Sequence, residues 1–431
     1  MNAHYRELLP EFRVTVRTIR NAMSEGLRRR RTSEQGNRVY PSTIMHTAEA
    51  CVQASLPDAG GGQMTGRAHL PGLPLIFMLS STAAFASGPT PAPGITWSGL
   101  VDVYYSKNFN SPSDEMNQLR NFDIYNNQFG FNLAKLTVQK QAQPVGFRLD
   151  LAFGPANDMV QGVAPYGTNA FSTLSLLEQA YIEALLPVGS GLTVDVGKFV
   201  TLMGNEVIES NSNWNYSRSF LFAYAIPYYH EGIRMTYDFA GNFSAQLHIV
   251  NSWNTVIDNN KSKDLGLELS YSPTTATTLT FNGMSGFEQP AGAKYGRRDL
   301  AEIIISQSVG NLSLVVDAVY GRDRIAGVYE DWKGVALYAK YDLDSQSDIA
   351  ARGEVYYDPF DYTTGLTFPK ATLKEVTLTY EYRPWIPLIV RVEARDDFAN
   401  GKAFLSAGSL NAGDFTRTSQ PTLLVGVITT F

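Results

Sequence analysis

The stretch VGFRLDLAFG, Val145–Gly154, alternates apolar and polar side chains with a period of two. The odd-numbered positions from Val145 to Phe153 are all apolar, whereas Arg148 and Asp150 lie between them. This period predicts a β-strand whose two faces lie in different environments. One face needs an apolar surround, and the other needs water or polar groups around a guanidinium and a carboxylate.

The same alternation recurs along the chain, for example in GIRMTYD, residues 232–238, and LGLELSY, residues 265–271. Beyond residue 95 no segment has a convincing helical period. Most candidate strands alternate clearly, but the second, tenth and twelfth alternate poorly. We predict sixteen strands, at 95–106, 128–140, 144–154, 177–187, 191–199, 229–238, 243–251, 264–272, 277–285, 298–307, 311–321, 332–342, 348–358, 373–383, 387–396 and 420–431.

The connections between these strands alternate between short and long. The short turns are expected at 141–144, 187–191, 239–242, 272–277, 309–311, 344–348 and 383–387. The long loops are expected at 107–127, 155–176, 200–228, 252–263, 286–297, 322–331, 359–372 and 397–419. In an up-and-down meander every long loop then lies at one end, as in outer-membrane barrels with long extracellular loops and short periplasmic turns. A soluble sandwich has no reason to sort its connections in this way.

Aromatic residues on the apolar face gather near the strand ends. They predict two girdles at the membrane interfaces, formed by Tyr105, Phe153, Tyr237, Tyr271, Tyr320, Tyr341, Tyr357, Tyr382 and Phe431. The C-terminal Phe431 follows an alternating last strand and resembles the signal that the barrel-assembly machinery recognises. The fold predicted is therefore all-β, a transmembrane up-and-down antiparallel barrel of about sixteen strands, closed because hydrocarbon does not tolerate an unpaired strand edge.

The apolar run LPGLPLIFMLSSTAAFA, residues 70–86, ends in a small-x-small pattern that predicts a secretory signal cleaved after Ala86. A buried helix is the alternative, but the following SGPTPAPG is typical of a linker. Met64 would give this signal an ordinary length, so the residues before it are expected to be an upstream extension, with an extended signal region as the other option. The predicted organisation is 1–63 extension, 64–86 signal peptide, 87–94 linker and 95–431 barrel.

Removing residues 1–86 takes ten basic and six acidic residues from 35 and 41, which leaves a net charge of −10. It also removes Cys51, the single cysteine, and the basic tract Arg28–Arg31. One cysteine excludes an internal disulfide framework and a thiolate zinc cluster. An exported, acidic chain without cysteine indicates a Gram-negative envelope protein and argues against nucleic acid as a partner.

A barrel of sixteen strands is too wide for its own side chains to fill, which predicts an aqueous channel unless loops plug it. The longest loop, 200–228, carries Glu206, Glu209 and Arg218 and is expected to fold inward and narrow the pore. Opposed charges across the bore would favour small hydrophilic solutes; alternatively, the charges pair with each other and hydrate a wide lumen. The predicted pore-lining residues are Arg148, Asp150, Arg234, Glu268, Asp317, Arg352, Glu354, Arg391, Glu393 and Arg395.

Enzymatic function finds little support in the residues. The segment GMSGF, 283–287, lacks the spacing of a nucleophile elbow, and residues 87–431 contain only two histidines, His230 and His248. The segment beginning at Asp258 fails as a calcium loop because Lys263 stands where the turn glycine should be. No cofactor and no metal are expected. A plugged barrel that serves as an anchor or surface interaction protein is the main alternative to a channel, and a barrel enzyme is a weaker one.

The chain resembles a known family, the Gram-negative porins called beta-barrel porin-2 or OmpL-like. The likeness runs over most of 95–431 and is carried by VDVGKF 194–199, GNEVIES 204–210, NYSRSFLF 215–222, HEGIRMTY 230–237 and NSWN 251–254. The resemblance implies a passive channel. It supplies no substrate and no binding residues. The barrel pattern itself predicts outer-membrane lipid and small hydrophilic solutes as partners. A monomer and a homotrimer both stay open, since small outward Gly99 and Val101 only hint at a flat wall for self-association.

Overall fold

The computed structural model describes residues 94–162, 173–239, 241–258, 260–288, 296–325, 327–366, 368–409 and 414–431. The predicted extension 1–63, the signal peptide 64–86 and all of the linker except Gly94 lie outside the described residues. Among the residues described, no helix is long and apolar enough to cross a membrane.

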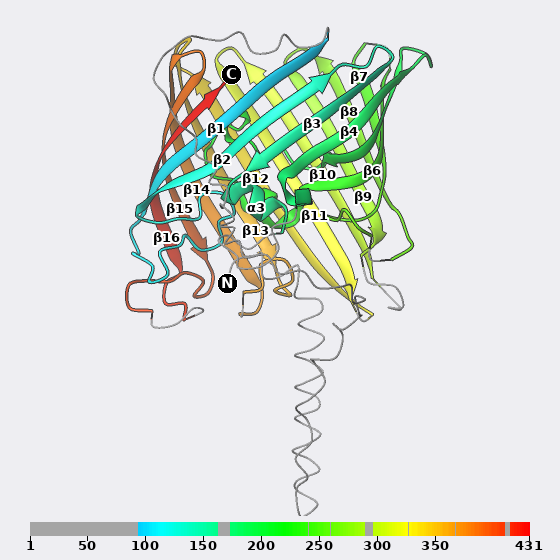
Figure 1. The fold of residues 1–431 in the computed structure, drawn as a ribbon. Coiled ribbons are helices and arrows are strands. Elements are labelled where there is room, and N and C mark those ends of the chain that lie inside the picture. The colour runs from blue at the N-terminus through cyan, green and yellow to red at the C-terminus, as the bar shows by residue number, and fades with distance from the viewer. Residues whose placement is uncertain are drawn as a thin grey trace, which may run out of the picture. The chain divides into compact units, whose positions relative to one another are not determined.

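Sixteen antiparallel strands form one closed barrel, which confirms the fold class predicted from the sequence (Figure 1). Their bounds are β1 Ile95–Asn108, β2 Gln128–Lys140, β3 Val145–Phe153, β4 Leu177–Leu186, β5 Leu192–Val200, β6 Tyr229–Phe239, β7 Phe243–Val250, β8 Asp264–Thr274, β9 Thr277–Phe287, β10 Arg297–Val309, β11 Leu312–Ile325, β12 Val328–Asp342, β13 Ser347–Asp358, β14 Ala371–Trp385, β15 Leu388–Ala399 and β16 Ser419–Thr430. Each strand pairs with its neighbours in sequence, and β1 pairs with β16 from Leu100↔Thr430 to Asn108↔Thr422.

The last residue completes the closure. The Phe431 backbone N–H donates to the Gly99 carbonyl at 3.1 Å, and the Gly99 N–H donates to the Phe431 carbonyl at 3.1 Å. The Phe431 ring lies over Gly99, where a Cβ atom would come within 2.0 Å of it. A side chain at position 99 would therefore displace the ring at the seam of the barrel.

Alternating burial follows the alternating sequence. In β3, Val145 and Phe153 are exposed, whereas Asp150 and Ala152 are fully buried. The exposed face of the wall is apolar, and the inward face carries most of the charged residues of the strands. A wall with this pattern is stable with hydrocarbon outside and polar groups inside.

The connections sort to the two ends as predicted, with one exception. The prediction of a long loop at 322–331 is wrong, because β11 continues to Ile325 and β12 begins at Val328. The polar segment there does not leave the sheet: Arg322 pairs with Asp331, and Arg324 pairs with Tyr329. In Figure 1 the short turns lie at the top with the C-terminus, and the longer connections lie below.

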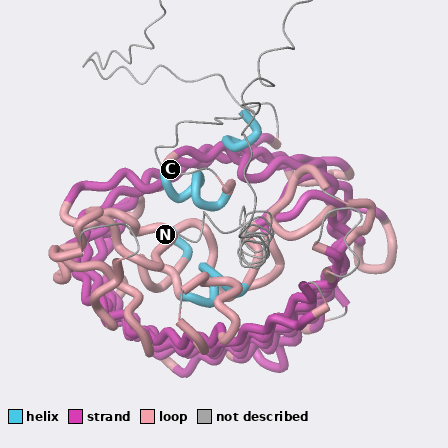
Figure 2. Tube along the Cα trace, turned by 90° about the horizontal axis from the view of Figure 1, so that it is seen from below, coloured by secondary structure: helices cyan, strands magenta, loops and turns pink. Residues whose placement is uncertain are grey.

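Loops and short helical segments occupy the inside of the ring of strands when it is viewed from the long-loop end (Figure 2). The described helical segments are α3 Pro155–Val160, η1 Thr173–Leu176, η2 Ser210–Ser212 and η3 Leu221–Ala225. Two of them, η2 and η3, belong to the connection between β5 and β6, which we call the inner loop, residues 201–228.

Candidate functional site: the lumen and its inner loop

An apolar segment fixes one half of the inner loop. Phe220, Leu221 and Ala225 are almost completely buried, and η3 packs against β11 and β12. On β12, the Trp332 indole N–H donates to the Ala225 carbonyl at 3.1 Å. This segment would expose a large apolar area if it left the barrel interior, so the hydrophobic effect holds it in place.

Two wall glutamates bind the backbone of the inner loop through its N–H groups. Glu354 of β13 accepts from Phe220 and Leu221, both at 2.6 Å. Glu393 of β15 accepts from the backbone N–H groups of residues 216 and 217, at 2.6 and 3.0 Å. Hydrogen bonds to a carboxylate are stronger than those to a neutral acceptor. Both glutamates therefore act as fixed anchors for the loop backbone.

Three wall arginines bind the carbonyl groups of the same loop. Arg352 and Arg395 donate to two adjacent carbonyls, those of Ser217 at 2.7 Å and Arg218 at 2.6 Å. Arg391 donates to three further loop carbonyls at 2.5 to 3.3 Å. All three guanidinium groups are almost completely buried. They are covered by the loop and do not line open space.

Each of these arginines also has a carboxylate partner on the wall. The ion pairs are Arg352–Glu375 at 2.6 Å, Arg391–Glu381 at 2.6 Å and Arg395–Asp397 at 2.7 Å. Only one predicted inner-loop acid joins this set: Glu206 pairs with Arg352 at 2.6 Å. A buried charge without a partner is costly, and here the partners come mainly from neighbouring strands.

A nearby strand, β1, holds the loop through a second polar contact. Asp102 of β1 is fully buried and accepts from the Tyr216 hydroxyl at 2.6 Å, the Asn132 amide at 2.7 Å and the Ser210 hydroxyl. Asp102 and Glu393 thus bind the same loop segment from different strands. Because β1 and β15 are separated by β16, this segment is held across three strands of the wall.

Lys135 of β2 makes a further bridge between wall and loop. Its ammonium pairs with Asp150 at 2.9 Å, with Glu178 and with the loop residue Glu209. Glu209 is the most exposed of the three acids, with 21% of its side chain accessible. Its carboxylate therefore borders open space while it binds the wall.

Burial affects the ionisation of the loop groups. It raises the pKa of the Tyr216 phenol well above its usual value, and the nearby Asp102 carboxylate adds to this effect. Tyr216 therefore stays a neutral hydrogen-bond donor. Burial also lowers the pKa of the Arg218 guanidinium, against the effect of the Glu206 carboxylate. Arg218 donates to carbonyls of its own loop and lies over the Phe122 ring, with 4.7 Å between its Cζ atom and the ring centroid.

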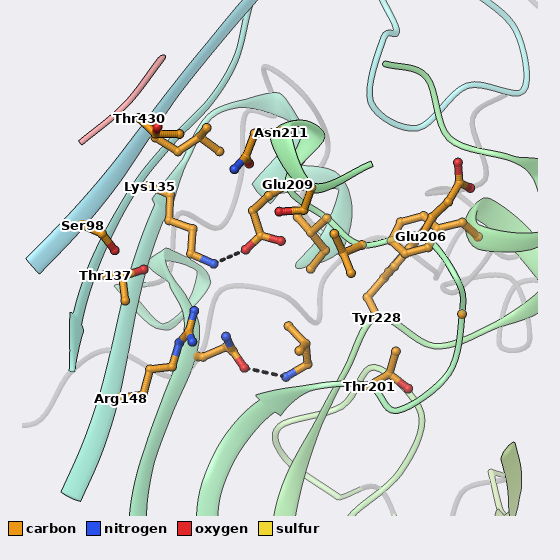
Figure 3. Close-up of a pocket in the computed structure, with 18 of the residues that line it drawn as sticks. Ser98, Lys135, Thr137, Arg148, Thr201, Glu206, Glu209, Asn211, Tyr228 and Thr430 are labelled. Carbon is orange, nitrogen blue, oxygen red and sulfur yellow. Dashed lines mark hydrogen bonds and ion pairs between the residues drawn. The ribbon is translucent and has the colours of Figure 1, made fainter. Parts of the chain in front are cut away.

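A cavity of about 650 Å³ lies between the inner loop and the wall formed by β1–β6 and the end of β16 (Figure 3). Lys135, Arg148 and Arg234 border it on the wall, and Glu206 and Glu209 border it on the loop. The cavity thus has bases on one side and acids on the other.

Both wall arginines of this cavity are themselves paired. Arg148 binds Asp150 at 3.0 Å, and Arg234 binds Asp195 at 2.7 Å. Each keeps accessible surface, with 32% of the Arg148 side chain and 15% of the Arg234 side chain exposed. These two arginines differ in this respect from the three that the loop covers.

A smaller cavity of about 270 Å³ lies on the other side of the inner loop, against β10–β12. Glu206 borders both cavities. Two further predicted pore-lining residues are Asp317, in this part of the wall, and Glu268, on β8. Asp317 is buried beside the loop, and Glu268 of β8 is half-buried.

The nine predicted girdle residues all lie on the wall or at its end, and none is buried. Exposure is greatest for Phe431, at 74%. Tyr105, Tyr237 and Tyr357 are half-buried, and the other five are exposed. Their contact with membrane lipid stays a prediction.

The comparisons with known proteins agree with this architecture. A sequence profile of the family described as "Putative beta-barrel porin-2, OmpL-like" matches residues 94–431. The chain belongs to this family. It is thus an outer-membrane porin-type barrel, and its family points to a channel and not to an enzyme. No curated protein matches the chain by sequence.

Solved structures similar to this OmpL-like barrel are also porins and outer-membrane channels. The anion-selective porin from Comamonas acidovorans matches with a TM-score of 0.54 and 12% identity, over 78% of this chain and 99% of that chain. The outer-membrane channel DcaP of Acinetobacter baumannii matches with a TM-score of 0.53 and 9% identity, over 78% of this chain and 97% of that chain. OmpT of Vibrio cholerae in its trimer form matches with a TM-score of 0.51 and 10% identity, over 78% of this chain and 99% of that chain. At these identities the likeness concerns the fold alone.

Several residues that organise the lumen of this OmpL-like barrel were missed in the sequence. Asp102 on β1 and Asp195 on β5 face inward and could have been found by the same parity that indicated Arg148. Lys135 was harder to find, because a register irregularity between β1 and β2 interrupts the alternation of β2. The apolar stretch FLFAYAIPYY, 220–229, is also a signal, since a loop of this composition is not stable in water.

Proposed function

We propose that this barrel conducts small hydrophilic solutes and ions by passive diffusion, through a lumen narrowed by the inner loop. The observation that carries the proposal is the attachment of the loop to the wall at several separate points, on β1, β2, β13 and β15. A loop fixed in this way acts as a stable constriction and not as a mobile flap.

The charges around the larger cavity support a polar route beside the loop. Solutes on this route pass Arg148 and Arg234 on the wall and Glu206 and Glu209 on the loop. Such opposed charges orient dipolar solutes and replace part of their hydration, which favours small polar molecules over apolar ones. The buried arginines of β13 and β15 serve to hold the loop.

Liposome swelling tests this proposal. Proteoliposomes containing the barrel are diluted into isotonic solutions of sugars of increasing size. We expect rapid swelling with monosaccharides and a steep decline with larger oligosaccharides. Absence of swelling with every sugar, while the inserted protein still shows the heat-modifiable mobility of a folded barrel, would contradict the proposal and favour a plugged barrel that acts as an anchor.

We also propose that the chain reaches the outer membrane after cleavage behind Ala86 and that Phe431 guides its insertion. The reciprocal hydrogen bonds between Phe431 and Gly99 support a role for the last residue in closing the barrel. N-terminal sequencing of the protein from outer membranes tests the cleavage site. Deletion of Phe431 should reduce the inserted fraction, and unchanged insertion would contradict its role.

A further inference from the structure

The hairpin formed by β11 and β12 carries an unusual set of side chains on the outer face of the barrel. In β11 the outward positions are those of Leu314, Val316 and Tyr320, all exposed, and the same parity continues to Arg322 and Arg324. The intervening residues, such as Asp323, are buried on the inner face. The outer face of the strand therefore changes from apolar to basic as the strand approaches the long-loop end.

The neighbouring strands add to this basic surface. Lys333 of β12 is directly opposite Tyr320, and Arg297 at the start of β10 shares the outward face with Asp299. We call Arg297, Arg322, Arg324 and Lys333 the outer basic cluster. Two outward acids, Asp299 and Asp331, lie among these four bases, so the patch has a net charge of +2 on a chain whose net charge is −6.

The basic side chains lie beside two outward tyrosines, the exposed Tyr329 and the half-buried Tyr357. The Arg322 and Arg324 guanidinium groups lie over the Tyr329 ring, with 5.1 and 5.4 Å between Cζ and the ring centroid. The Lys333 ammonium lies 5.6 Å from the centroid of Tyr357. Tyrosines with this position are typical of the interface between hydrocarbon and headgroups. This position predicts that headgroups, and not acyl chains, surround the cluster.

The height of the cluster follows from strand geometry. Arg322 and Arg324 lie two and four residues beyond Tyr320, which is about 7 and 13 Å along the strand. With the usual tilt of about 40°, these distances correspond to roughly 5 and 10 Å along the membrane normal. Outward-facing bases cost little at this depth, in contrast to the bilayer midplane.

We propose that the outer basic cluster binds the phosphate groups of an anionic, phosphorylated lipid in the leaflet on the long-loop side of the membrane. Guanidinium groups form paired hydrogen bonds with phosphate oxygens, and arginines fixed on two adjacent strands present such donors without large ordering costs. Arg297 and Arg322 each bind Asp299 at 2.9 Å. Surface ion pairs of this kind are weak, so a phosphate can share these donors.

The position of the cluster favours a lipid over a soluble anion. Its members point away from the lumen, on the same face as the apolar band of β10–β12. A lipid bound there places its acyl chains along Val316, Val335 and Leu337, all exposed. The site therefore combines phosphate recognition with an apolar wall, which free phosphate cannot use.

Native mass spectrometry of the protein extracted from outer membranes tests the proposal. The protein in neutral detergent is titrated with diphosphorylated lipid A, with lipid A lacking phosphates, and with inorganic phosphate in molar excess. The test variant is Arg322→Gln/Arg324→Gln/Lys333→Gln. The matched control is Lys107→Gln/Lys140→Gln/Lys374→Gln, which removes the same charge from other outward positions on β1, β2 and β14.

We expect tight binding of the diphosphorylated lipid by the wild type and the control. At about 1 kcal/mol per base near a charged lipid surface, the triple variant should bind on the order of 100-fold more weakly. Equal affinities of the test variant and the wild type would overturn the proposal. Competition by inorganic phosphate, or equal binding of the phosphate-free lipid, would also overturn it. An Arg324→Gln/Lys333→Gln variant, which leaves the Arg322–Asp299 pair intact, provides the same comparison if the triple variant folds poorly. The conductance should be unchanged in all of these variants.

Discussion

Neutralising the two glutamates that anchor the inner loop should loosen the loop. In the Glu354→Gln/Glu393→Gln variant, each side chain keeps one acceptor oxygen and turns an amide group toward the second backbone N–H. Each position therefore loses at least one hydrogen bond to a charged acceptor, worth about 1.5–3 kcal/mol. The two substitutions together make loop docking less favourable by roughly 3–6 kcal/mol. This shifts the docked population at least 100-fold toward undocked conformations.

Single-channel recording detects this change as flicker between current levels, because an undocked loop alters the bore. The control is Asp348→Asn, on the inward face of β13, which pairs with Arg383 and has no described contact with the inner loop. We expect frequent transitions in the double variant and steady currents in the control. Steady wild-type currents in a double variant with wild-type heat stability of the barrel would refute the anchoring role of these glutamates.

Three further changes test the polar route and the loop contacts. Replacing Arg148 and Arg234 together with glutamine should shift the reversal potential in a salt gradient toward cation selectivity, and an unchanged potential would contradict their place on the route. Glu209→Gln should shift the potential in the opposite direction, by less, since its carboxylate is partly neutralised by its wall partner; a shift of the same sign as that of the arginine variant would contradict this reasoning. Tyr216→Phe removes the hydroxyl that donates to Asp102 at 2.6 Å and should weaken loop docking by about 1–3 kcal/mol, seen as faster proteolysis of the inner loop; an unchanged cleavage rate would exclude this contact as an anchor.

The strands could be predicted because each carries its own evidence. Alternation such as that of Val145–Phe153 arises because one face of a strand lies on the apolar outside of the barrel and the other on the polar inside. All sixteen predicted strands are present. The failure at 322–331 has a physical reason. Arg322 and Arg324 indicate a loop only if outward residues must be apolar, whereas the rim of a barrel tolerates charge on its outer face. Polarity alone could not mark the end of the strand there.

The lumen was predicted less completely than the wall. The alternation of each strand placed Arg352, Arg391 and Arg395 on the inward face. It could not predict that the inner loop, which is distant in sequence, covers them. Their partners are backbone carbonyls and N–H groups of the inner loop, which have no signature in the sequence. Arg148 and Arg234, which no loop covers completely, remain candidates for contact with solutes.

Single-channel conductance of the protein in a planar bilayer tests the central claim most directly. The protein purified from outer membranes is added at low concentration, and its insertion is followed as discrete current steps. An open barrel with a fixed inner loop predicts uniform, ohmic steps that persist at both polarities. Folded barrels that insert without any current would contradict the channel and require the inner loop to be a plug.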